Sequence, residues 1–137
     1  MTAIALATAA RVEVVESIEQ MTIPAAEDIT PGQPVRLDTS SGKFTSANGT
    51  TAAEARVYGI AVGTHVIKAG MPVTAVAKGV LDGFTFTQAW DAPIYLSDTD
   101  ATLADAAGTV STIVGRIVPG TAELLGNALA KLLRVSL

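Results

Sequence analysis

Apolar and polar residues alternate along most of the chain, over short stretches separated by turn residues. Two such stretches are residues 35–38 and residues 133–137. Further apolar stretches bounded by turn residues occur at 57–62, 73–77, 80–87, 92–96 and 113–118. A period of two between turn signals predicts β-strands. Seven or eight short strands at this spacing predict a mainly β fold, a single small β-barrel or sandwich.

Glycine marks several of the predicted turns. Asn48-Gly49 lies in a polar stretch and is a hairpin signal. Lys78-Gly79 predicts a break between the strands at 73–77 and 80–87, because glycine weakens a strand interior. Residues 97–108 are mostly small or polar and predict a loop.

Residues 1–23 differ from the rest, because every Gly and Pro of the chain follows them. Val14, Val15, Ile18 and Met21 recur at helical spacing, whereas the stretch 10–14 alternates as a strand does. Both conformations stay open. We therefore expect an N-terminal arm at 1–23, partly helical or extended, and a β-rich body at 24–137.

Composition limits the classes of partner. Hydrophobic residues make up 49% of the chain and aromatic residues 4%, so Ala, Val, Leu and Ile must form the core. The net charge of −4 and the nine dispersed Lys and Arg residues argue against nucleic-acid binding. No cysteine is present, which excludes disulfides and thiolate metal sites. The apolar segment 4–10 is far shorter than a membrane span of about 20 residues, so we expect a soluble protein made in the cytoplasm.

Candidate catalytic chemistry is sparse. His65 is the only histidine, and no acid adjacent in sequence orients it, which favours a surface or strand-end residue over a general base. The nucleophile motif Gly-x-Ser-x-Gly does not occur. We predict a protein that is not an enzyme, with no catalytic or cofactor-binding residues.

Three aspartates in one stretch are the best metal candidates. Asp98, Asp100 and Asp105 offer hard oxygen ligands of the kind that Ca²⁺ prefers. However, the residues that follow do not supply the glycine and the bidentate Glu of an EF-hand loop. A solvated loop is the favoured interpretation and no metal site is predicted, although a loose Ca²⁺ site stays open.

Trp90 is the only tryptophan of the chain and lies between two predicted strands. A lone Trp in a protein with few aromatics is either buried in the core or an anchor at an interface, because its large area dominates the energetics of both. The sequence leaves these two alternatives open.

An ordered set of motifs resembles a known family. The stretches that carry the resemblance are 58–62 (YGIAV), 69–80 (AGMPVTAVAKGV), 92–99 (APIYLSDT), 113–118 (IVGRIV) and 132–135 (LLRV). In this order they resemble the small β-rich cement or decoration proteins of tailed-bacteriophage capsids.

The resemblance implies a structural virion protein on the capsid exterior. Such a protein binds the outer surface of the assembled capsid and stabilises contacts between major capsid subunits. It implies the major capsid protein as partner and self-association, as a homotrimer or alternatively a dimer, with no nucleic acid or membrane. The residues expected at a capsid or subunit interface are Ile4, Leu6, Val12, Val14, Ile18 and Trp90.

Two other functions fit the same composition. One is another virion part, a β-module of the tail or baseplate, which would differ only in its partner. The other is a small-ligand or sugar-binding β-barrel, which predicts a concave apolar pocket near Trp90 or Phe84.

Overall fold

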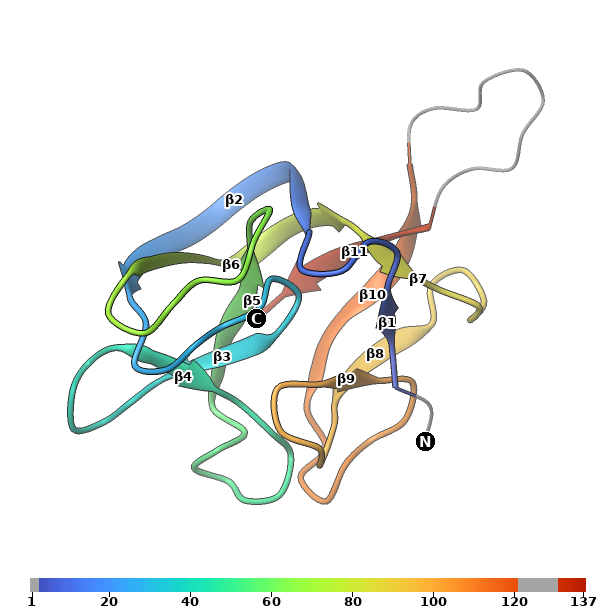
Figure 1. Cartoon of the computed structure of the whole chain (residues 1–137). Helices are drawn as coiled ribbons and strands as arrows, with labels where there is room; N and C mark the ends of the chain where they lie inside the picture. Colours follow the sequence, from blue (N-terminus) through green and yellow to red (C-terminus); the bar gives the residue numbers. More distant parts are fainter. Residues whose placement is uncertain (1–2, 121–130) are drawn as a thin grey trace.

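A computed structural model describes residues 3–120 and 131–137 of the chain, and these residues form strands and loops without a helix (Figure 1). The mainly β fold is therefore confirmed. The strands are β1 (Ala5–Leu6), β2 (Glu13–Pro24), β3 (Pro34–Leu37), β4 (Phe44–Ser46), β5 (Val57–Val62), β6 (Pro72–Asp82), β7 (Phe84–Thr85), β8 (Pro93–Leu96), β9 (Leu103–Ala104), β10 (Ile113–Pro119) and β11 (Lys131–Ser136). Three of these have only two residues, so the longer strands agree with the expected number.

The long strand β6 organises the main sheet. One of its edges pairs with β2 over the whole length of both strands. The other edge pairs first with β5, at residues 74–76, and then with β11, at residues 78–81. From there the sheet continues as β5-β3-β4 in one direction and β11-β10-β8-β9 in the other. The strands curl into a half-barrel, and β1 and β7 form a separate small pair (Figure 1).

Two hydrophobic clusters fill the curled sheet. The larger contains Ile60, Leu81, Ile94 and Leu133, from β5, β6, β8 and β11. The smaller is formed by residues from β3 to β6 and the segments around them, among them Phe44, which is fully buried. Aliphatic side chains supply nearly all of both clusters, as the composition predicts.

The predicted break at Lys78-Gly79 is wrong, because β6 runs through it without interruption. Gly79 has a φ of +154°, which L-residues rarely adopt, and a Cβ there would clash with the carbonyl oxygen of Glu16 on β2. The glycine is needed because β2 approaches closely at the point where β6 changes partner from β5 to β11. Glycine here permits pairing on both edges instead of ending the strand.

Residues 13–23 form a strand, which decides between the two conformations that the sequence left open for this part of the chain. The strand β2 extends to Pro24 and lies along β6, while Val12, just before it, is 1% exposed and belongs to the larger cluster. Residues 1 and 2 of the predicted arm lie outside the described residues. The division into an arm at 1–23 and a body at 24–137 stays a prediction.

The predicted loop 97–108 contains the short strand β9, which pairs with β8 and is buried. No helix long and apolar enough to span a membrane occurs in the described part of the chain.

Candidate functional site

The six residues predicted at an interface lie in two different environments. Val12 is buried, and Ile4 and Leu6 are partly buried against the same cluster, so all three serve the protein's own core. Val14, Ile18 and Trp90 are exposed. Of the six predicted interface residues, therefore, only the last three are exposed enough in the described structure to contact a partner directly.

The strand β2 is exposed from Glu13 to Gln20, and two of its aliphatic side chains lie where its pairing with β6 is irregular. Val14 pairs with Leu81 and Glu16 with Val80, which leaves Val15 without a partner on β6. Such an extra residue is a β-bulge, which bends a strand and redirects its side chains. Val15 is 57% exposed as a result.

A second bulge follows three residues after Val15. Ser17 pairs with Gly79 and Glu19 with Lys78, so that Ile18 is the extra residue, and it is 70% exposed. We call the exposed residues Val14, Val15 and Ile18 the β2 patch. The residues predicted from the sequence include Val14 and Ile18 but not Val15, because pairing register is not visible in a single sequence.

Trp90 lies on the loop between β7 and β8 and is 45% exposed, so it does not fill the core. The ammonium group of Lys131 lies 5.2 Å from the centre of the indole ring, a cation–π contact. Lys131 also donates a hydrogen bond to the backbone carbonyl of Gln88 on the same loop. Trp90 is thus fixed by β11 and keeps nearly half of its surface accessible.

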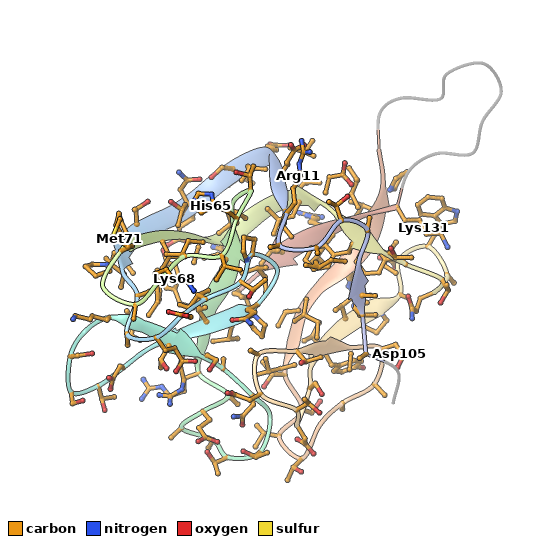
Figure 2. All side chains as sticks on the ribbon, viewed as in Figure 1. Arg11, His65, Lys68, Met71, Asp105 and Lys131 are labelled. Carbon is orange, nitrogen blue, oxygen red and sulfur yellow. The ribbon has the colours of Figure 1, made fainter. Side chains whose placement is uncertain are left out.

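His65 lies in the exposed loop after β5, as the sequence predicts. Within the described residues its side chain has no hydrogen bond or ion pair with a neighbouring group. Figure 2 shows that His65 and Asp105 lie on different parts of the molecule. The described structure thus gives this imidazole no carboxylate that would orient it as a general base.

The three candidate aspartates bind different partners. The carboxylate of Asp98 accepts hydrogen bonds from the backbone N–H of Thr109 at 2.7 Å and from its hydroxyl at 2.8 Å. Asp105 accepts a hydrogen bond from the side-chain amide of Gln88 at 3.5 Å. Within the described part of the chain, no group of three or more acidic or His side chains is arranged to hold a metal ion.

Asp100 belongs to a hydrogen-bonded cluster around Ser46, a residue that is almost fully buried. The Ser46 hydroxyl lies 2.8 Å from Oε1 of Glu27 and 3.0 Å from Oδ2 of Asp100. Asn48 donates a further hydrogen bond to Asp100 at 3.1 Å. The cluster connects β4 to the chain that follows β2 and to the loop after β8, which is a structural role.

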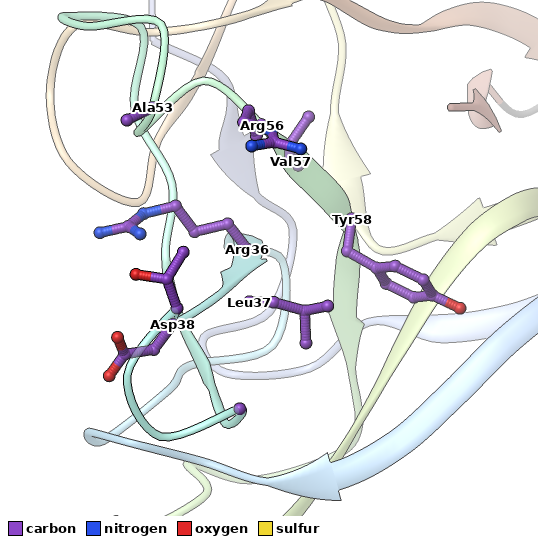
Figure 3. Close-up of a pocket in the computed structure, with 9 residues that line it drawn as sticks. Arg36, Leu37, Asp38, Ala53, Arg56, Val57 and Tyr58 are labelled. Carbon is purple, nitrogen blue, oxygen red and sulfur yellow. The ribbon is translucent and has the colours of Figure 1, made fainter.

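A groove of about 800 Å³ lies where β3 and β5 meet the loops around residues 38–42 and 53–56 (Figure 3). Leu37, Val57 and Tyr58 provide apolar lining, and Arg36 and Arg56 provide charge. Burial, and secondarily the charge of Glu19, raise the pKa of the Tyr58 hydroxyl.

The polar groups of this groove do not converge. In Figure 3 the guanidinium of Arg36 and the hydroxyl of Tyr58 point to opposite sides of Leu37. Specific small-molecule sites combine an apolar lining with a few polar groups aimed at one ligand. The groove therefore lacks the arrangement that would orient a small ligand or sugar.

The pocket that the ligand-binding alternative predicts near Phe84 is small. Phe84, Ile4 and Leu6 line a hollow of about 210 Å³, below the size of about 300 Å³ at which ligand pockets begin. Trp90 lines none of the described hollows.

Comparison of the chain with protein-family models, with curated proteins and with solved structures found no match in any of the three.

Proposed function

We propose that this chain is a structural virion protein that binds the outer surface of an assembled phage capsid and stabilises contacts between major capsid subunits. The order of motifs from Tyr58 to Val135 supports this class. The observation that carries the proposal is the β2 patch, where two bulges turn aliphatic side chains to solvent on an outer strand. We propose the major capsid protein as partner, with self-association as a homotrimer or, alternatively, a dimer.

The β2 patch has the chemistry of a protein-binding surface. Val15 and Ile18 are β-branched, so they lose little side-chain entropy when a partner covers them. Burying such a side chain contributes about 1.5–3 kcal/mol. Trp90, held in place by Lys131, offers a second anchor of the kind that dominates many interfaces.

The mechanism requires no chemical reaction. A protein that binds the assembled shell but not its separated subunits stabilises the shell by mass action. Binding at symmetric positions makes many modest contacts act together. A side-chain patch on a strand that is itself paired along its whole length to β6 suits this role, because the patch is held rigidly before binding.

Co-sedimentation with empty capsids tests the proposal. The double variant Val15→Ser, Ile18→Ser is expected to bind capsids at least about tenfold more weakly than the unaltered protein, because it buries less apolar surface on binding. Val66→Ser is the matched control, because Val66 is an exposed aliphatic residue of the loop between β5 and β6 and is not part of the β2 patch. Point substitutions are preferable to deletion of the N-terminal segment, which would remove Val12 from the core.

Two results would count against the proposal. Binding of the unaltered protein to isolated tails and not to capsids would favour the tail or baseplate module. Equal capsid binding by the double variant and the Val66→Ser control would show that the β2 patch is not the contact surface.

A further inference from the structure

The outer face of the main sheet carries a group of basic residues. The register places Glu16, Val80, Arg134, Arg116 and Pro93 side by side in one row across β2, β6, β11, β10 and β8. These residues project away from the larger cluster, because the residues that precede and follow Arg134 and Arg116 are buried. A second row places Glu19 beside Lys78 and Lys78 beside Ser136. We call Lys78, Arg116 and Arg134, three of the nine Lys and Arg residues, the basic face.

Arg116 and Arg134 are direct partners across β10 and β11. Like charges directly opposite each other on an antiparallel pair are destabilising. Arg116 is partly compensated, because it donates a hydrogen bond to the carbonyl of Asp91 and lies 3.8 Å from its carboxylate. Arg134 and Lys78 have no ion pair with any described residue. The protein thus holds two opposed guanidiniums, of which only that of Arg116 has a carboxylate beside it.

Two shallow hollows meet at Arg134. One, of about 300 Å³, is lined by Ile113, Gly115, Arg116, Arg134 and Ser136. The other, of about 250 Å³, also includes Arg134 and Ser136 and extends to Lys78 and to Ile18 of the β2 patch. The basic face is therefore hollowed and adjoins exposed aliphatic side chains at both ends.

We propose that the basic face binds an acidic, extended segment of a partner protein. Neighbouring strands are about 4.8 Å apart, so the guanidiniums of Arg116 and Arg134 can bind one carboxylate together or two carboxylates of one segment. The partner's carboxylates would supply the counter-charge that Arg134 lacks. Ile18 and Ile113 would contact apolar side chains of the same segment.

A protein segment fits this face better than a nucleic acid does. Glu16 and Glu19 border the basic face on β2 and would repel a phosphate backbone that crosses the sheet. An acidic peptide can avoid this repulsion by placing an apolar or basic side chain opposite these two glutamates. Its apolar residues can also use Ile113, which is 44% exposed.

The inference deepens the proposed function and rests on it only in taking the partner to be a protein. The test measures fluorescence anisotropy of fluorescein-labelled hexaglutamate with the full-length protein at low salt. The double variant Arg116→Gln, Arg134→Gln is expected to bind hexaglutamate about tenfold more weakly for each charge-assisted hydrogen bond that the substitutions remove. The double variant Lys43→Gln, Arg56→Gln is the matched control for loss of two positive charges, since both residues are exposed and lie outside the basic face, before β4 and before β5.

Folding of the double variant is checked by its melting temperature. Removing two opposed positive charges should leave this temperature unchanged or raise it. A marked fall would mean that the guanidiniums are structural, and would count against a docking role. Hexaglutamate binding that is absent, or equal in the double variant and the unaltered protein, would overturn the inference. Tighter binding of a labelled single-stranded DNA than of hexaglutamate would overturn it as well.

The same assay separates the inference from the proposed function. Val15→Ser, Ile18→Ser is expected to lose capsid binding but to keep most of its hexaglutamate binding, since all three cations remain. If the protein binds no capsid and still binds hexaglutamate through Arg116 and Arg134, the capsid proposal fails and the inference stands. If the protein binds capsids, and Arg116→Gln, Arg134→Gln changes neither capsid binding nor hexaglutamate binding, the inference alone fails.

Discussion

Gly79 offers a sharp test of how β6 pairs on both edges, and the change is Gly79→Ala. The backbone at this position has a φ of +154°, and a side chain held there costs about 1–3 kcal/mol. A Cβ would also clash with the carbonyl oxygen of Glu16, an atom of the β2 backbone that cannot rotate away. Overpacking of this kind costs a further 1–3 kcal/mol or so. Together these terms destabilise the fold by about 2–6 kcal/mol.

This range converts into a change that thermal unfolding can measure. For a domain of this size 1 kcal/mol corresponds to roughly 3 °C, so Gly79→Ala should lower the melting temperature by at least about 6 °C. The assay is thermal unfolding followed by circular dichroism. Gly42→Ala is the matched control: its φ is +70°, but a Cβ there would meet no atom within 4 Å, so only the conformational cost of about 1–2 kcal/mol applies.

The comparison of the two variants decides the outcome. If Gly79→Ala melts at the same temperature as Gly42→Ala, β2 does not approach β6 as closely as described. The bulges that define the β2 patch would then be in doubt as well, because they lie on either side of this contact.

Three further changes test other parts of the fold. Ile94→Asp places an unpaired carboxylate at a fully buried site of β8 and should unfold the protein. The control Ile113→Asp changes an exposed site and should keep the β-type circular dichroism spectrum. A folded Ile94→Asp protein would contradict the burial of β8. Ser46→Ala should lower the free energy of unfolding in urea by about 1–3 kcal/mol, because the single proton of the Ser46 hydroxyl is shared between the carboxylates of Glu27 and Asp100; an unchanged value would show that the cluster is not stabilising. The pKa of Asp38 lies below its ordinary value of 3.8, chiefly because the backbone N–H of Ser40 stabilises the carboxylate. The ionised Asp38 therefore stabilises the folded state above pH 3.8, and this stabilisation is lost as the pH falls through the lowered pKa. Asp38→Asn removes it, so the melting temperature of the variant should fall less steeply in acid than that of the unaltered protein. Identical slopes of melting temperature against pH would exclude the effect.

Much of the fold was predictable because its signals are local. The strand predicted at 57–62 has the same bounds as β5, and the strand predicted at 113–118 differs from β10 by one residue. These stretches combine β-branched residues with Gly63 or Pro119-Gly120 directly after them, which are local signals of a strand and of its end. The break at Lys78-Gly79 was wrong because the local signal of a glycine does not reveal close approach by a distant strand.

The candidate surfaces were less predictable because they depend on register. The exposure of Val15 follows from a bulge, and a bulge is defined only by the residues that pair on the other strand. Lys78, Arg116 and Arg134 are far apart in sequence and meet on one face through β6, β10 and β11. Dispersed charges along the chain therefore became a concentrated group in space.

The irregular pairing of β2 also explains how the protein can leave one edge of this strand exposed without pairing with other chains. The strand β2 pairs only with β6, and isolated bridges involve only the residues just outside it, Val12 with Gly63 and Ala25 with Phe44. Its other edge therefore has no partner strand among the described residues. Long exposed edges invite pairing with other chains, and bulges and charged side chains prevent it. Both means of preventing such pairing occur in β2, which has two bulges and several glutamates. A partner is therefore expected to bind the side chains of Val15 and Ile18 and not to add a strand to β2, which is why the substitutions that test the β2 patch change side chains alone.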